Sequence, residues 1–144
     1  MTNAPRSEPA LKPVPESDEV TRFYWDAAAA GHLAIQRCAR CARWQHPPDI
    51  VCHACQHDRL MPTVVSGFGT LYSYGIAYRA VDRAFNESGP YIVALVELNE
   101  QAGLRLLTNV VDGDAMDLRI GMPMRVVFEA RDAIFLPQFT PCTS

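Results

Sequence analysis

The chain of 144 residues is short of lysine and histidine. Lys12 is its single lysine, and no histidine follows His57. Thirteen Lys and Arg against sixteen Asp and Glu give a formal net charge of −3, which argues against a dedicated nucleic-acid binder, a class that is usually basic. Because residues 64–144 contain no histidine, this part of the chain also lacks the usual base for a serine or cysteine nucleophile.

Long apolar runs and cofactor motifs are missing too. The longest apolar stretches, such as 91–96, have the length of a strand, whereas a membrane-spanning helix needs about 20 residues. The sequence holds no G-x-G-x-x-G motif, phosphate loop or H-E-x-x-H motif, so nucleotide-cofactor enzymes and metalloproteases have no support. The first 19 residues contain four prolines and no apolar core, which argues against a signal or transit peptide. We therefore expect a cytoplasmic protein without membrane insertion.

Residues 1–17 and 18–32 differ sharply in pattern. The first segment is polar and rich in proline, which predicts a flexible tail. The second has the apolar spacing of an amphipathic helix, which Ser17 or Asp18 would cap and Gly31 would end. Its aromatic residues would either pack on the same domain or dock onto a partner protein; they are Phe23, Tyr24 and Trp25.

The region 63–140 is predicted to be a small β-domain. Its five strand-like runs are separated by turn residues, with a short helical turn at 115–120 before the fourth, and the polar stretch 82–90 reads as a loop. This pattern favours a five-stranded barrel of the OB type, with a β-sandwich fragment as the alternative. On the first run, Tyr72, Tyr74 and Tyr78 alternate and are predicted to share one face, where they would stack on a planar ligand or fill the barrel. The runs cover 67–78, 91–98, 105–111, 124–129 and 135–139.

The segment 33–62 contains the strongest signal, two C-x-x-C pairs separated by ten residues. Each pair offers two thiolates from one tight turn, and two such knuckles close a tetrahedral site. The little alternation and the prolines of this segment favour a metal-organised structure over a packed sheet. The predicted ligands are Cys38, Cys41, Cys52 and Cys55.

Zinc is the favoured metal because a four-thiolate site has no open position and serves structure. The same ligands suit a rubredoxin-type iron, and disulfides are the remaining alternative, which a reducing compartment disfavours. The nearby histidines are interpreted as surface residues and Cys142 as a free thiol. Arginines gather around the knuckles and either bind a phosphate or an acidic partner or form a solvated face; they are Arg37, Arg40, Arg43 and Arg59.

Several separated motifs together resemble one family. They are the Phe23-Tyr24-Trp25-Asp26 helix, Leu33–Cys38 with the second knuckle, Ser66–Tyr74, Tyr91–Leu98 and Leu118–Pro123. In this order they are similar to the acyl-CoA-associated family that joins a rubredoxin-like zinc ribbon to an OB-fold and was long catalogued as a domain of unknown function. The resemblance covers residues 20–139. One departure is that family knuckles commonly place glycine after the second cysteine of each pair, where this chain has Ala42 and Gln56.

The resemblance implies a non-catalytic accessory subunit of a thiolase-like or related acyl-CoA enzyme, in lipid or aromatic acid metabolism, with one structural zinc and no activity alone. The partner would carry out carbon–carbon bond formation or cleavage, and the barrel would meet the acyl-CoA. The residues expected to contact acyl-CoA or the partner are Phe23, Tyr24, Trp25, Arg37, Arg40, Tyr72 and Tyr74. The alternatives are a single-stranded nucleic-acid-binding OB-fold protein and a rubredoxin-like electron carrier.

Overall fold

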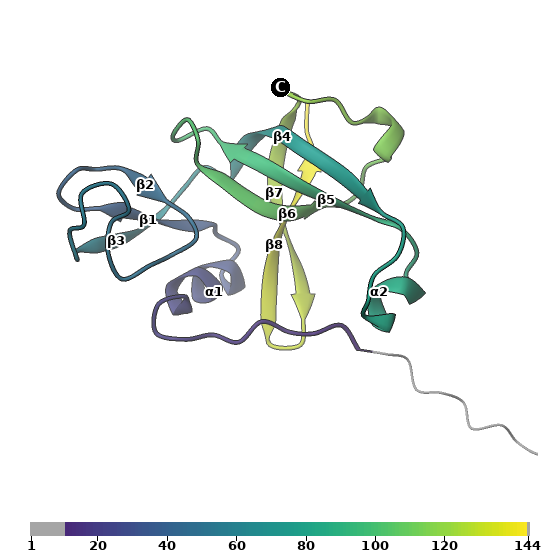
Figure 1. The fold of residues 1–144 in the computed structure, drawn as a ribbon, viewed down its shortest axis with the longest axis horizontal. Helices are drawn as coiled ribbons and strands as arrows, with labels where there is room; N and C mark the ends of the chain where they lie inside the picture. Colours follow the sequence, from purple (N-terminus) through teal and green to yellow (C-terminus); the bar gives the residue numbers. More distant parts are fainter. Residues whose placement is uncertain (1–10, 144) are drawn as a thin grey trace, which may run out of the picture.

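The computed structural model describes residues 11–143, which form two short α-helices, a three-stranded sheet and a closed five-stranded barrel (Figure 1). The small sheet and the barrel lie side by side, and the first helix lies below their junction. The predicted mainly-β fold is confirmed. The elements are α1 (Arg22–Ala29), β1 (Ala34–Cys38), β2 (Trp44–Gln45), β3 (Leu60–Val64), β4 (Phe68–Ala77), α2 (Arg83–Glu87), β5 (Tyr91–Leu98), β6 (Arg105–Val110), η1 (Ala115–Asp117), β7 (Pro123–Arg131) and β8 (Ile134–Pro141).

Helix α1 is shorter than the segment predicted from its periodicity. Asp18 Oδ1 accepts hydrogen bonds from the second and third backbone N–H groups after it, at 3.0 and 2.8 Å, and so organises a turn that delays the helix to Arg22. At the other end Gly31 has φ 82°. The N–H groups of Gly31 and of the next residue donate to the carbonyls of Ala28 and Ala27, which is a Schellman ending. Gly31 thus ends the helix as predicted.

The cysteine segment contains a packed sheet as well as the two knuckles, so only the part of the prediction that disfavoured a sheet is wrong. Its strands run antiparallel in the order β2-β1-β3. Strand β1 lacks the usual alternation because Ala34, Ile35 and the polar Gln36 are all buried. That burial removed the period of two on which a strand prediction depends.

The barrel closes in the order β4-β5-β6-β8-β7, which confirms the OB-type prediction and excludes the sandwich. Strand β6 meets β8 in parallel at Val110 and Phe139 alone, and α1 packs mainly against β8. Gly69 lets β4 approach β5, since a Cβ there would collide with the backbone carbonyl of Glu97. The largest fully buried side chains of the barrel are Leu71, Val96, Leu98, Leu106, Met124 and Phe139.

A β-bulge in β4 separates the tyrosines that the sequence pattern placed on one face. The register against β5 shifts between Leu71 and Ser73. Tyr72 is therefore exposed, whereas Tyr74 is half-buried and its hydroxyl donates to the Leu118 carbonyl at 3.4 Å. The predicted common face is wrong because a bulge adds one residue to the strand and inverts the alternation beyond it.

The polar stretch 82–90 contains the short helix α2, which sequence analysis took for a loop. The Asp82 side chain caps it by accepting from the Ala84 N–H at 2.8 Å. Residues 11–18 run below the β7–β8 hairpin toward α2 (Figure 1), and Arg131 Nη1 donates to the Pro13 carbonyl at 3.3 Å. Residues 1–10 of the predicted tail lie outside the described residues, and flexibility of 11–17 stays a prediction. No helix in the described range 11–143 is long and apolar enough to cross a membrane.

Candidate metal centre and contact residues

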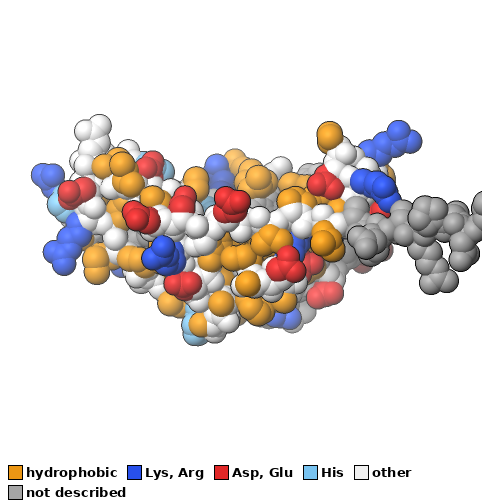
Figure 2. All heavy atoms as spheres, turned by 90° about the horizontal axis from the view of Figure 1, so that it is seen from below, with side chains coloured by type: hydrophobic (Ala, Val, Ile, Leu, Met, Phe, Trp, Pro, Cys, Tyr) orange, Lys and Arg blue, Asp and Glu red, His pale blue; other side chains and the backbone are white. Residues whose placement is uncertain are grey.

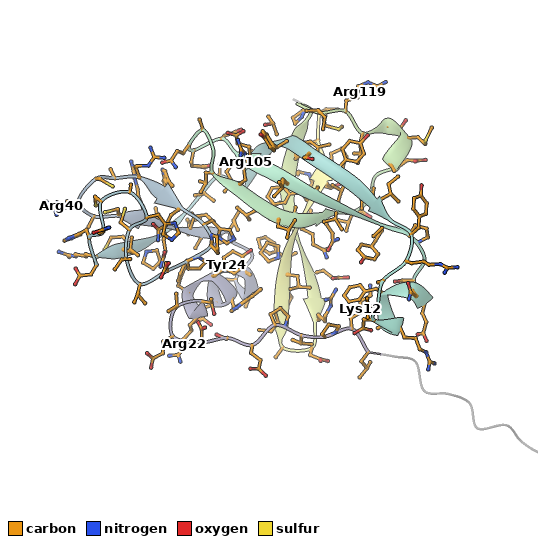
Figure 3. All side chains as sticks on the ribbon, viewed as in Figure 1. Lys12, Arg22, Tyr24, Arg40, Arg105 and Arg119 are labelled. Atoms are coloured by element: carbon orange, nitrogen blue, oxygen red, sulfur yellow. The ribbon has the colours of Figure 1, made fainter. Side chains whose placement is uncertain are left out.

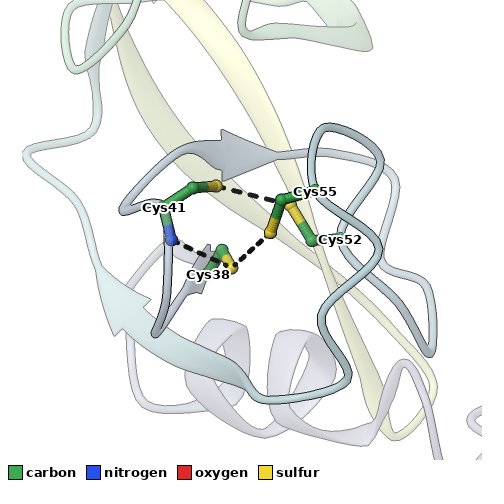
Figure 4. A group of neighbouring side chains, drawn as sticks. All are labelled: Cys38, Cys41, Cys52 and Cys55. Carbon is green, nitrogen blue, oxygen red and sulfur yellow. Dashed lines mark hydrogen bonds between the residues drawn. The ribbon is translucent and has the colours of Figure 1, made fainter.

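The four cysteines of the two knuckles come together at one end of the small sheet (Figure 4). Their sulfur atoms all lie within 4.8 Å of one another. The Sγ atoms of Cys38 and Cys55 are 3.6 Å apart, as are those of Cys41 and Cys52. The predicted ligand set is therefore assembled by the fold.

Backbone N–H groups of the knuckles stabilise thiolates. Those of Cys55 and Ala54 lower the pKa of the Cys52 thiol to about 6, and that of Cys41 lowers the pKa of Cys38. The His57 N–H favours the thiolate of Cys55, but desolvation and the neighbouring sulfurs outweigh it and raise the pKa of Cys55 to about 11. Four thiolates cannot coexist here without a cation to compensate their repulsion.

The geometry fits zinc. A tetrahedral site with Zn–S bonds of about 2.3 Å separates its sulfur atoms by roughly 3.8 Å, close to the 3.6 Å of the Cys38–Cys55 and Cys41–Cys52 pairs. All four positions are taken by protein ligands, so an ion here holds structure and has no open position for substrate.

The residues that replace the usual knuckle glycines adopt the conformation that glycine favours. Ala42 has φ 64° and Gln56 has φ 63°, both in the left-handed region that costs an L-residue about 1–2 kcal/mol. The departure from the family pattern thus places residues with a side chain at two left-handed positions, where each adds strain to its turn.

Two buried glutamines that sequence analysis missed attach the second knuckle to the sheet. Gln45 Nε2 donates to Gln36 Oε1 at 3.0 Å and to the Val51 carbonyl at 3.1 Å. Gln45 Oε1 accepts from the His53 N–H at 2.8 Å, and Gln36 bonds the backbone of Asp49 in both directions. The loop that carries Cys52 is therefore fixed by side-chain amides.

The aromatic residues of α1 are half-buried within this chain. Tyr24 stacks edge-on against Trp25, with ring centroids 4.9 Å apart, and lies 5.4 Å from the ring of His46. Burial raises the pKa of Tyr24 and lowers that of His46 to about 4. His46 is thus half-buried and contacts α1, whereas a fully exposed residue was expected. Contact of Phe23, Tyr24 or Trp25 with a partner stays a prediction.

The remaining predicted contact residues lie on two separate surfaces. Arg40 lies at the outer end of the ribbon (Figure 3), and the Arg37 guanidinium lies 4.9 Å from the Trp44 ring centroid. On the barrel, the Arg105 guanidinium stacks 3.7 Å from the ring centroid of Tyr72. The fold thus brings Tyr72 together with Arg105, which sequence analysis missed, and separates it from Tyr74.

The ribbon and the barrel are joined by Gln101, from the turn between β5 and β6. Its Oε1 accepts from the Trp44 N–H at 2.9 Å, and its Nε2 donates to the Trp44 carbonyl at 3.0 Å. The Gln101 side-chain amide thus pairs with the backbone N–H and C=O of Trp44 in β2, as the backbone of a neighbouring strand would.

Comparison with known proteins agrees with this two-part architecture. Residues 25–61 match the model described as "ChsH2, rubredoxin-like zinc ribbon domain" and residues 63–129 match "ChsH2, C-terminal OB-fold domain". A "DUF35 domain-containing scaffold protein" of Methanothermobacter thermautotrophicus is 33% identical over 67% of this chain and 71% of its own length. The chain belongs to the DUF35 family. The suspected family is thereby confirmed, and the four cysteines are those of its zinc ribbon.

Two further similar proteins carry the names of enzymes or enzyme subunits. A "Probable enoyl-CoA hydratase alpha subunit" of Thermomonospora curvata is 39% identical over 92% of this chain and 40% of its own length. The chain thus spans about two fifths of that relative. The solved structure "Ltp2-ChsH2(DUF35) aldolase" superposes with a TM-score of 0.78 and 37% identity, covering 89% of this chain and 98% of that one.

Proposed function

We propose that this protein is a non-catalytic subunit that assembles with an acyl-CoA enzyme, of the thiolase-like or a related type, and contributes to acyl-CoA binding. The observation that carries the proposal is the likeness, at 37% identity over 98% of its length, to the DUF35 chain of the aldolase structure. The hydratase alpha subunit supports the same class of partner.

The chemistry of the chain supports a role without catalysis. Its closed four-thiolate site has no free position for a reacting group. The barrel contains no histidine, and burial keeps His46 neutral near pH 7 by lowering its pKa to about 4. The reacting groups would then lie on the partner. Thiolate ligands also suit a reducing compartment such as the cytoplasm.

The surface gives less support to nucleic-acid binding. Figure 2 shows acidic, basic and apolar side chains interspersed over one face, with no continuous basic groove. On the barrel, the apolar Leu107 is exposed and lies two residues after Arg105 on β6. A single-strand binder needs a positive groove lined with aromatic platforms.

The test is capture of partners by the tagged protein from its host lysate, with the captured proteins identified by mass spectrometry. We expect an acyl-CoA hydratase, aldolase or thiolase-like enzyme in stoichiometric amount. Cys52→Ser removes a metal ligand and should abolish capture, whereas Cys142→Ser changes a half-buried thiol outside the cluster and should not. Absence of any acyl-CoA enzyme from the wild-type capture would refute the proposal.

A further inference from the structure

A cavity of about 510 Å³ lies at the junction of ribbon and barrel. Its size is within the range of small-molecule sites, roughly 300–1,000 Å³. Its walls come from three parts of the chain: the stretch around β2 with Arg43 and Trp44, the second knuckle, and the β5–β6 turn with Gln101. The four ligand sulfurs point toward one another, so the cavity borders the metal centre without containing it.

The charge of the wall is positive. Arg43 supplies this charge, and no Asp or Glu is among the residues that line the cavity. His53 is paired outside the lining, with Asp49 at 3.2 Å. Arg43 makes no side-chain hydrogen bond or ion pair with any residue of the described range 11–143. An arginine without a counter-ion at a concave surface is suited to a phosphate, which its planar fork can bind in bidentate fashion.

Trp44 adds an aromatic wall beside that charge. Arg37 lies over its ring at 4.9 Å and is itself held by a hydrogen bond from its Nε to the Ala42 carbonyl at 2.9 Å. An aromatic side chain flanked by arginine is the combination on which nucleotide bases stack.

The walls are fixed relative to one another before any ligand binds. Gln101 holds the backbone of Trp44 from the barrel side through two hydrogen bonds. Gln45 holds the His53 N–H from the sheet side. Such preorganisation lowers the entropic cost of binding.

We propose that this junction pocket binds a phosphorylated purine nucleotide, with Arg43 contacting the phosphate and Trp44 stacking on the base. The nucleotide end of a CoA thioester has both features. The inference therefore rests on the proposed function and deepens it, by assigning the contact with CoA to the ribbon–barrel junction and not to the barrel face of Tyr72. Gln101 is a positioning residue of this pocket.

The experiment is calorimetric titration of the zinc-loaded full chain with CoA, ADP, adenosine and inorganic pyrophosphate. We expect CoA and ADP to bind with Kd below about 1 mM, and Arg43→Ala to weaken both by about tenfold or more. Arg59→Ala is the matched control, since it removes an equal charge from the ribbon outside the pocket. It should change Kd by less than about twofold, because screening weakens distant surface charges. Trp44→Phe should weaken ADP more than pyrophosphate.

Three results would overturn the inference: no binding of CoA or ADP at millimolar concentration, equal weakening by Arg43→Ala and Arg59→Ala, or binding of pyrophosphate as tight as that of ADP. Partner capture is scored separately on the same variants. Capture without nucleotide binding refutes the pocket alone, and nucleotide binding without capture of an acyl-CoA enzyme refutes the proposed function alone.

Discussion

The side-chain amide of Gln101 forms two hydrogen bonds with the backbone of Trp44, from a turn 57 residues further along the chain. Strand β2 has only two residues and pairs with β1 on one side. Gln101 supplies its partner on the other side. Gln101 is therefore a polar link between ribbon and barrel, in addition to the apolar core that Leu33 and Ile35 share with the barrel.

Gln101→Ala should destabilise the zinc-loaded protein by about 1–3 kcal/mol, because it leaves a half-buried N–H and C=O without partners. Gln101→Glu keeps the acceptor for the Trp44 N–H and loses the donor, so its effect should be intermediate. Urea unfolding followed by fluorescence measures both. Two variants as stable as the wild type would show that the link is dispensable.

Glycine after the second cysteine of each knuckle should stabilise the folded protein. Ala42→Gly and Gln56→Gly relieve left-handed residues at φ 64° and 63°, and we expect each to stabilise the holo protein by about 0.5–1 kcal/mol after the entropy cost of glycine. Ala39→Gly is the control. Ala39 lies in the first knuckle and has no positive φ, so glycine at this position should lower the stability of the protein. Chemical unfolding compares the three; an equal effect at all three positions would contradict the assignment of strain.

The stability of the protein should fall in acid because of His46. Its pKa is about 4 in the folded state against 6.5 for an unperturbed histidine, so the unfolded chain binds more protons between these values. The contribution is fully present above pH 6.5 and is lost as pH falls toward 4. The loss amounts to about 2 kcal/mol at pH 5.

His46→Phe keeps a ring beside Tyr24 and removes this titration. The difference in unfolding free energy between wild type and variant, measured at pH 7 and pH 5, isolates the effect from proton uptake at the cysteines. If this difference in unfolding free energy is the same at pH 7 and at pH 5, the titrating group is not His46.

Metal content tests the ligand assignment. The wild type should carry one zinc per chain, measured by inductively coupled plasma mass spectrometry. Cys52→Ser should carry none and lose ordered structure in the ribbon, because zinc binding and ribbon folding are one equilibrium. Cys142→Ser should match the wild type. A metal-free Cys52→Ser protein with a folded ribbon would contradict the structural role.

The features that sequence analysis predicted well depend on local patterns. Each C-x-x-C pair is one turn, and the run 91–98 is a continuous β-branched and apolar stretch, so the metal centre and β5 were predicted with their residues. Gly31 ended α1 as expected for the same reason.

What the sequence did not predict depends on pairing between distant segments. The bulge at Tyr72 exists only relative to β5, and three buried strand residues in a row hid β1. Glutamine carries no signal of its partner, so Gln36, Gln45 and Gln101 could not be recognised as the residues that hold the ribbon together.

The most direct test of the accessory-subunit account is turnover of acyl-CoA by three samples: this protein alone, the captured partner alone, and the two recombined. The account predicts no turnover by this protein, and a partner whose activity rises when the protein is added back. Turnover by this protein alone, or a partner equally active without it, would contradict the account.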